Sequence, residues 1–226
     1  RARQRILDLA ATQLPTGAHL DPAAPSLPVG NMPLAIAPAP GPAGRYVLLL
    51  SGWREQGLQV VDAIKGQVLQ TLPQPGAFLG LAFSVDGKTL FASGGNDDSI
   101  WRYDWTDGVA SFHDRLILAQ KEPGKPGTRY PAGLALSSDG TRLYVAENLS
   151  DSLAVLDTKD GRIIADLPVG HSPYAVVVDA EQTVWVSTWG DDVVVAFAPD
   201  GHGGLTETAR VEAGRHPSAL LLNADS

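Results

Sequence analysis

Residues 131–167 have the sequence PAGLALSSDGTRLYVAENLSDSLAVLDTKDGRIIADL. Four short apolar runs alternate there with polar turns. Asp139-Gly140 and Asp160-Gly161 each separate two of these runs, and Asp-Gly readily supplies the positive φ angles that tight hairpins need. The stretch therefore predicts four antiparallel strands joined by short connections.

The same pattern recurs along the chain. Comparable units begin at Pro33, Phe78, Pro131 and Pro173, and a partial unit begins at Pro217. The last two steps are 42 and 44 residues long, and a period of about 40–45 residues with four strands in each unit is typical of propeller blades. We predict an all-β protein, a β-propeller of four-stranded antiparallel blades, with four complete blades and the start of a fifth.

Apolar runs such as AVVV and VVVAF lack the alternation of a half-exposed strand. Continuous apolar runs are expected when a sheet is covered on both faces, as each blade is by its neighbours. A β-sandwich would show cleaner alternation and no fixed period. The pattern therefore favours the propeller over the sandwich.

The chain divides into two parts. Residues 1–30 predict a lead-in, with a short helix at 1–13 followed by an extended strap rich in Pro and Gly, and residues 31–226 hold the blades. A seven-bladed ring needs roughly 300 residues at this period. The chain is therefore either part of a longer protein, with an incomplete ring, or an unusual small ring, and we expect the former.

Composition excludes several classes of protein. The formal net charge is −8, which argues against nucleic acid as a partner because such proteins carry a basic patch. There is no cysteine, which removes disulfides, thiolate catalysis and cysteine-bound zinc. No apolar run reaches the ~18 residues of a membrane span. No cofactor is predicted.

The stretch LYVAENLSDSLAVLDTKDGRIIADLPVGHSPYAVVVDA (143–180) resembles the repeat of the YVTN-type bacterial β-propellers. The matching positions are Tyr144-Val145, Asn148, Val155-Leu156-Asp157-Thr158, Val169-Gly170 and Pro173-Tyr174. The match is weaker in the second and fourth units, and weakest in the first, where Ser51-Gly52-Trp53 replaces the Thr-Asn pair. The resemblance implies an extracytoplasmic protein, periplasmic or secreted, often with a seven-bladed ring and without established catalytic residues.

A second resemblance concerns a possible additional domain. FASGGNDDSIWRYDW (91–105), together with LPTG (14–17), is similar to a subset of these proteins. In that subset the propeller precedes an alkaline-phosphatase-like or phospholipase-C-like domain. This resemblance implies an intramolecular phosphoesterase partner outside the given sequence.

Candidate site residues gather at one predicted end of the blades. In an antiparallel blade the connections between strands two and three share an end with those that lead to the next blade. An insertion at 113–127 also falls there. Loops on a rigid scaffold commonly carry binding function. The candidate ligand-binding residues are Trp53, Arg54, Asn96, Arg129, Tyr130, Glu147, Asn148, His171, Trp189, Arg215 and His216.

Alternatives stay open for these residues. Asp98, Asp151 and Asp192 each follow the end of a second strand by five residues, and this recurrence indicates a turn or a backbone-bonding role. Asp98, Glu147, Asp191 and Asp192 are weak candidates for a hard-cation site. His171, His216, Arg215 and Arg129 are either exposed loop residues or a cationic patch for a carboxylate or phosphate. Trp53 and Trp189 either pack locally or stack on a sugar or peptide.

The sequence favours a non-catalytic module that binds a protein, glycan or small-molecule ligand, and serves as a scaffold. The alternative is a lactonase-like propeller that hydrolyses a sugar lactone with carboxylates and histidines of this face. A haem- or quinone-associated propeller fits poorly, because C-x-x-C-H is absent and Met32 is the single methionine. No nucleophile elbow, phosphate-binding loop or H-E-x-x-H motif occurs.

Overall fold

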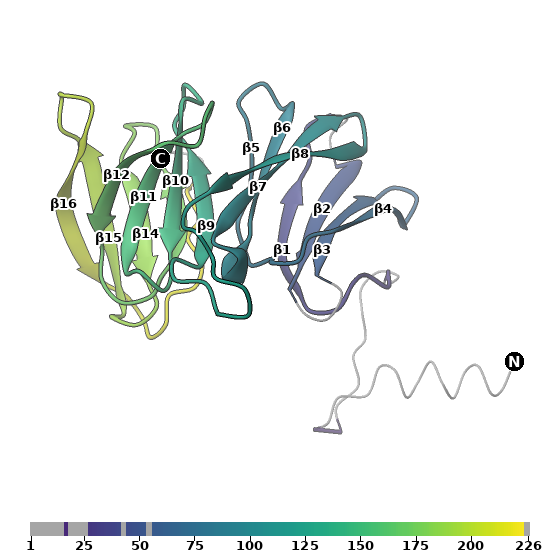
Figure 1. Ribbon diagram of the computed structural model, residues 1–226, viewed down its shortest axis with the longest axis horizontal. Helices are drawn as coiled ribbons and strands as arrows, with labels where there is room; N and C mark the ends of the chain where they lie inside the picture. The colour runs from purple at the N-terminus through teal and green to yellow at the C-terminus, as the bar shows by residue number, and fades with distance from the viewer. Residues whose placement is uncertain (1–15, 18–26, 42–43, 53–55, 224–226) are drawn as a thin grey trace, which may run out of the picture.

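The computed structural model describes residues 16–17, 27–41, 44–52 and 56–223. Within these ranges the chain forms sixteen β-strands and one 3-10 helix, η1 (Gly95–Asp97) (Figure 1). The strands are β1 (Pro33–Pro38), β2 (Tyr46–Ser51), β3 (Gly57–Asp62), β4 (Gln67–Pro73), β5 (Leu81–Phe83), β6 (Thr89–Ser93), β7 (Ser99–Thr106), β8 (Val109–Ile117), β9 (Pro131–Leu136), β10 (Arg142–Glu147), β11 (Ser152–Asp157), β12 (Ile163–Pro168), β13 (Pro173–Val178), β14 (Val184–Thr188), β15 (Val193–Pro199) and β16 (Leu205–Glu212).

The strands form four sheets, and each sheet consists of four consecutive antiparallel strands hydrogen-bonded in chain order. These are propeller blades, called blade 1 (β1–β4), blade 2 (β5–β8), blade 3 (β9–β12) and blade 4 (β13–β16). The predicted fold class is confirmed. No strand forms from Pro217 to Asn223, within the described part of the predicted fifth blade. Among the described residues no helix is long and apolar enough to cross a membrane.

The predicted lead-in is described only in part. The helix predicted at 1–13 lies outside the described residues, and the strap is described only at 16–17 and 27–30. Gly30 donates its backbone N–H to Gln59 of β3 (2.6 Å).

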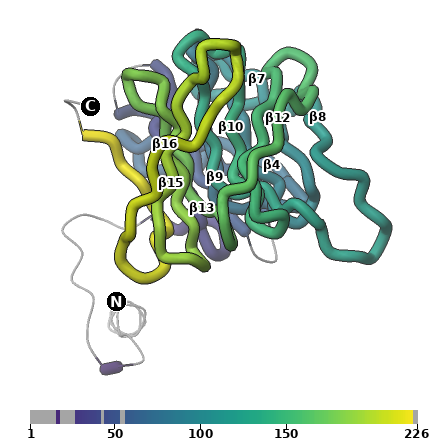
Figure 2. The backbone as a smooth tube through the Cα atoms, turned by 90° about the vertical axis from the view of Figure 1, so that its left-hand side faces the viewer, coloured from purple at the N-terminus to yellow at the C-terminus, as the bar shows by residue number. Residues whose placement is uncertain are grey.

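The insertion at 113–127 was placed partly wrong, because 113–117 extend β8, a nine-residue strand. The connection between β8 and β9 spans 118–130 and projects from the strands at the right of Figure 2.

The cores lie between adjacent blades and explain the continuous apolar runs. Successive side chains of a strand point to opposite faces, so Leu90 packs between blades 1 and 2 while Phe91 packs between blades 2 and 3. In the same way, Leu143 faces blade 2 and Tyr144 faces blade 4. Both faces of these middle strands are buried, as the lack of alternation indicates.

The first strands of neighbouring blades approach one another closely. A Cβ added at Gly80 would lie 2.2 Å from the carbonyl oxygen of Ala132, and one at Gly133 would lie 2.6 Å from that of Tyr174. The third position of every unit is correspondingly small, with Ala or Gly at 35, 80, 133, 175 and 219. Small residues at this position let the backbones of successive inner strands meet.

We expect Gly133→Ala to destabilise the protein by about 1–3 kcal/mol, because the new methyl group meets the β13 backbone, which cannot rotate away. The measurement is the thermal midpoint by circular dichroism. Gly214→Ala is the matched control, since its Cβ meets no atom within 4 Å. Equal midpoints for the two variants would contradict the close approach.

Candidate functional site

The irregular connections gather at one end of the blades, here called the loop face. In Figure 1, η1 and the β8–β9 connection lie together at the lower edge, whereas the tight β15–β16 turn lies at the top. The connections from each blade to the next start and finish at this end. The loop face therefore brings together segments that are far apart in sequence.

A buried carboxylate holds the connection that enters blade 3. Asp98 is 1% exposed. Its two oxygens accept the backbone N–H groups of Thr128 (2.6 Å), Arg129 (3.0 Å) and Tyr130 (2.9 Å), while its own carbonyl accepts the N–H of Leu118 (2.9 Å). Asp98 thus fixes both ends of the long β8–β9 connection.

The same arrangement recurs in the other blades. Oδ1 of Asp151 accepts the N–H of Ser172 (2.9 Å), and Oδ1 of Asp192 accepts that of His216 (2.8 Å). In blade 1, where the sequence has Gln56, its side chain accepts the N–H of Ala77 (3.0 Å). The backbone-bonding role predicted from the recurrence is what the structure contains.

The residue just before a unit's proline takes a left-handed backbone conformation at four positions, with φ between 50° and 56°. These residues are Met32, Tyr130, Ser172 and His216. Such φ values are uncommon outside glycine and costly for a bulky residue. The repeated geometry thus presents a different side chain at each position of the loop face.

We expect Asp98→Ala to lower the free energy of unfolding by roughly 3 kcal/mol, because three backbone donors lose a buried charged acceptor. Asp192→Ala is the matched control. It has a similar positive φ, but its side chain is 41% exposed, and we expect a loss of about 1 kcal/mol or less. Urea unfolding measures both; equal losses would contradict a special role for Asp98.

An ion-pair cluster built around one buried carboxylate lies next to this connection. Nη1 of Arg129 donates to Glu147 (2.6 Å) and to Asp166 (2.9 Å). Glu147 is fully buried, and its Oε2 also accepts hydrogen bonds from Ser150 and Ser152 (3.0 Å each). Burial raises the pKa of Glu147 above its usual value, although Arg129 and the serines oppose the rise. Arg129 is therefore neutralised by carboxylates rather than free for a ligand.

We expect Arg129→Met to destabilise the protein by about 3 kcal/mol at neutral pH, because it leaves a buried carboxylate without its cation. The pKa of Glu147 would then rise further. Since the folded state would bind that proton more tightly than the unfolded state, the loss should shrink as the pH falls toward 4.5.

The matched control for this prediction is Arg210→Met. Arg210 pairs with Glu207, but both side chains are 41% exposed, and an exposed pair contributes less than about 1 kcal/mol. Urea unfolding at several pH values measures both variants. A pH-independent loss in Arg129→Met would contradict the assignment to Glu147.

Three aromatic rings meet where the first strands of blades 2, 3 and 4 begin. The ring of Phe78 lies 5.1 Å from that of Tyr130 and 5.6 Å from that of Tyr174, edge to face in both cases. Asn148 secures this region, because its side chain donates to the carbonyl of Pro173 (3.2 Å) and its N–H to that of Tyr130 (3.1 Å).

Tyr174 also borders a cavity between the inner strands. The cavity has a volume of about 490 Å³ and is lined by parts of β1, β5, β9 and β13 and by residues 218–220. Its position among the inner strands identifies it as the central channel. The three rings therefore lie at the loop-face end of this channel, and we call them the mouth cluster.

A second cluster occupies the loop face of blade 4. Nδ1 of His171 lies 2.9 Å from Oδ2 of Asp151, and the backbone N–H of His171 donates to Asp191 (2.7 Å). The ring of His216 stacks on Trp189, with centroids 4.0 Å apart, and its Nδ1 lies 3.0 Å from the carbonyl oxygen of Trp189. Both histidines are held through Nδ1, so each Nε2 is available.

The remaining predicted residues have separate positions. Asn96 is exposed and accepts the N–H of Gly127 (2.8 Å), and Arg215 is exposed near the C-terminus. Trp53 and Arg54 lie outside the described residues. The weak metal candidates Asp98, Asp191 and Asp192 are each bonded to a backbone N–H. Within the described ranges no three His, Cys, Asp or Glu side chains are grouped as a metal site requires.

The residue list from the sequence omitted Phe78 and Tyr174. A signal for both existed: Phe78 replaces the proline that starts the other units, and Tyr174 replaces the Leu, Ala or Ser found at its position elsewhere. Comparing units for departures at channel-facing positions would have selected them.

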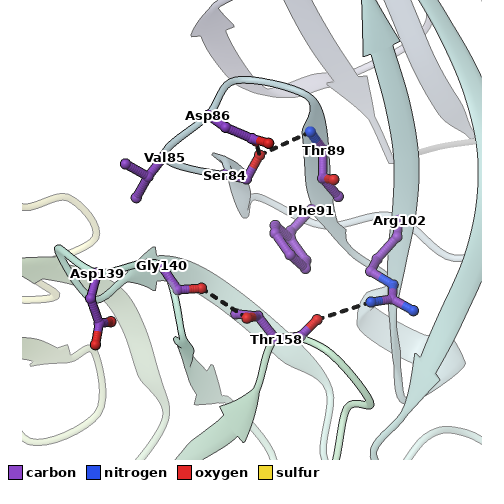
Figure 3. Close-up of a pocket in the computed structure, with 9 residues that line it drawn as sticks. All are labelled: Ser84, Val85, Asp86, Thr89, Phe91, Arg102, Asp139, Gly140 and Thr158. Carbon is purple, nitrogen blue, oxygen red and sulfur yellow. Dashed lines mark hydrogen bonds between the residues drawn. The ribbon is translucent and has the colours of Figure 1, made fainter.

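A further pocket lies at the opposite end, between blades 2 and 3 (Figure 3). Its volume is about 320 Å³. Its charged groups already have partners: Arg102 binds Asp114 and the carbonyl of Thr158, and Asp86 and Asp139 accept from serines of their own turns. The hydrogen bond from Ser137, together with those from Thr141, lowers the pKa of Asp139 to about 2. These charged side chains therefore stabilise the turns around the pocket and are not free to bind a ligand.

One family model matches part of the chain. Residues 124–225 match a family model described as the SMP-30/gluconolactonase/LRE-like region. The match covers less than half of the chain. It includes the ion-pair cluster of Arg129, the two tyrosines of the mouth cluster, and the cluster of His171 and His216. No curated protein sequence matches the chain significantly.

Solved structures show the same fold. The periplasmic gluconolactonase PpgL of Pseudomonas aeruginosa is similar with a TM-score of 0.66 and 21% identity, over 83% of this chain and 55% of that one. A candidate 6-phosphogluconolactonase of Bacteroides uniformis gives a TM-score of 0.65 and 16% identity, over 83% and 56%. A protein of unknown function from Desulfotomaculum acetoxidans gives 0.63 and 18%, over 79% and 55%. The chain spans little more than half the length of these structures.

Proposed function

We propose that the chain is part of a β-propeller hydrolase that opens a sugar lactone at the loop-face end of its channel. The observation that carries the proposal is the family match of residues 124–225, which include Tyr130, Glu147, His171 and His216. The gluconolactonase neighbours support the same class of substrate. These comparisons favour the lactonase over the non-catalytic scaffold that the sequence favoured.

His171 is the residue best suited to activate water. Histidine is the side chain most often used as a general base. The contact between its Nδ1 and Asp151 (2.9 Å) orients the ring and would stabilise the imidazolium formed when Nε2 takes a proton. Nδ1 of His216 lies closest to a carbonyl oxygen (3.0 Å), and the nearest carboxylate, that of Asp192, is 3.6 Å away, so its charged partner is more distant than that of His171.

The proposed reaction balances without a cofactor. Water loses a proton to Nε2 of His171 as its oxygen bonds to the lactone carbonyl carbon. The ring carbon–oxygen bond then breaks, and the departing oxygen takes the proton back from the imidazolium. The product is the open hydroxy acid.

The wider setting is also a proposal. A periplasmic or secreted location agrees with the periplasmic neighbour, and a seven-bladed ring would complete the channel. The YVTN-type repeat and the phosphoesterase partner rest on the sequence resemblance alone. A protein, glycan or small ligand bound without turnover stays the alternative.

We expect His171→Gln to lower kcat for a sugar lactone by about 100-fold or more, because general-base catalysis typically contributes 10²–10⁴-fold. The assay follows acid release by the natural polypeptide that carries this sequence, with glucono-1,5-lactone as the first substrate. His202→Gln is the control, since His202 is exposed in the β15–β16 turn at the opposite end.

Two results would contradict the proposal. Unchanged kcat in His171→Gln would remove His171 from the reaction. Absence of turnover by the unaltered polypeptide over a panel of five- and six-membered sugar lactones would leave the non-catalytic binding module as the better description.

A further inference from the structure

We propose that the mouth cluster, Phe78, Tyr130 and Tyr174, is the subsite that holds the polyhydroxylated carbons of the sugar, in the lactone and in the open acid alike. The identity of the ligand rests on the proposed function, but the subsite itself is argued from the cluster's geometry. It assigns binding to three aromatic residues from three different blades, of which the sequence pattern indicated only Tyr130.

Each ring comes from the start of a different inner strand. Phe78 precedes β5, Tyr130 precedes β9, and Tyr174 is the second residue of β13. The ring of Phe78 contacts the rings of both tyrosines, with interplanar angles of 78° and 77°. All three side chains are partly rather than fully buried, so the cluster keeps aromatic surface open to a ligand.

The two phenol groups have no hydrogen-bond partner in the part of the chain that the structure describes. Neither hydroxyl makes a hydrogen bond to any described residue. Burial raises the pKa of both tyrosines, and the proximity of Tyr130 adds to the rise in Tyr174. Both hydroxyls therefore stay protonated at neutral pH, and each can donate one hydrogen bond and accept others.

This combination fits a polyhydroxylated ligand. Ligand sites are usually lined by apolar and aromatic side chains with a few polar groups that fix orientation. The apolar C–H face of a sugar can lie against the aromatic rings while its hydroxyls pair with the phenols. The adjoining channel cavity of about 490 Å³ falls within the usual ~300–1,000 Å³ for small-molecule sites.

The backbone of Tyr130 is a further sign of a dedicated position. Its φ of 55° is unfavourable for a bulky side chain, and the hydrogen bonds of Asp98 to residues 128–130 hold it in place. At the same place in the next units the chain has Ser172 and His216. The fold therefore requires the backbone conformation but not the tyrosine.

The test is the binding of gluconate, the open product, to the natural polypeptide by titration calorimetry. Because gluconate is not consumed, this readout is independent of turnover. We expect the double variant Tyr130→Phe plus Tyr174→Phe to weaken gluconate binding about tenfold or more, and Phe78→Leu to weaken it by removing the central ring. In lactone hydrolysis the double variant should mainly raise KM.

The control is Tyr46→Phe. This substitution also removes one phenol hydroxyl. Tyr46, however, begins β2 and lies beside Gly108 of the β7–β8 turn, at the opposite end of the blades. Its gluconate affinity should equal that of the unaltered protein. Circular dichroism and thermal midpoints confirm that each variant is folded.

The outcomes separate this inference from the proposed function. Unchanged gluconate affinity in the double variant, or no gluconate binding by the unaltered protein at millimolar concentration, overturns the subsite. Loss of binding in the double variant supports it even if no lactone is hydrolysed, in which case only the hydrolase proposal fails. Turnover that depends on His171 but not on the tyrosines supports the hydrolase proposal and overturns the subsite.

Discussion

The loop face depends on one interaction, a side-chain oxygen at the end of one blade that accepts backbone N–H groups from the segment entering the next. Asp98 is its fullest form, with three backbone donors on one buried carboxylate. A charged acceptor in a buried position makes strong hydrogen bonds and is costly to leave unpaired. The interaction therefore holds the segment that leaves each blade, and with it fixes the placement of Tyr130, Ser172 and His216.

This constraint acts together with the packing between blades. Leu90 and Phe91, or Leu143 and Tyr144, send neighbouring side chains into different cores, so no blade can shift without disturbing two cores. Gly80 and Gly133 allow the inner strands to meet at the backbone. The mouth cluster is consequently supported by rigid elements on all three of its blades, although its residues stand at or beside connections.

The architecture could be predicted from sequence because it is repeated. Asp-Gly turns, continuous apolar runs and the spacing of the unit starts each carry local information, and their recurrence multiplies it. The bonding role of Asp98, Asp151 and Asp192 followed from the same comparison of units. The main boundary error, at 113–117, arose because β8 is longer than the fourth strands of the other units and alternates in burial.

The site was less predictable because its contacts join different blades. Sequence placed Arg129, Glu147, Tyr130 and His171 on one end, but not the pairing of Arg129 with Glu147 and Asp166, nor that of His171 with Asp151. Asp166 belongs to a regular strand and carried no motif. The meeting of Phe78 with Tyr130 and Tyr174 depends on how blades 2, 3 and 4 turn about the channel, which no local pattern encodes.

The left-handed residue before each unit's proline has a consequence for how such a protein can change. Its backbone conformation is nearly the same at four positions, whereas its side chain differs from Met to Tyr, Ser and His. The residues that fix the backbone and the residue whose side chain varies are thus at separate positions of the same repeat. A single replacement at one of these positions can therefore change the side chains of the loop face while the backbone keeps its conformation.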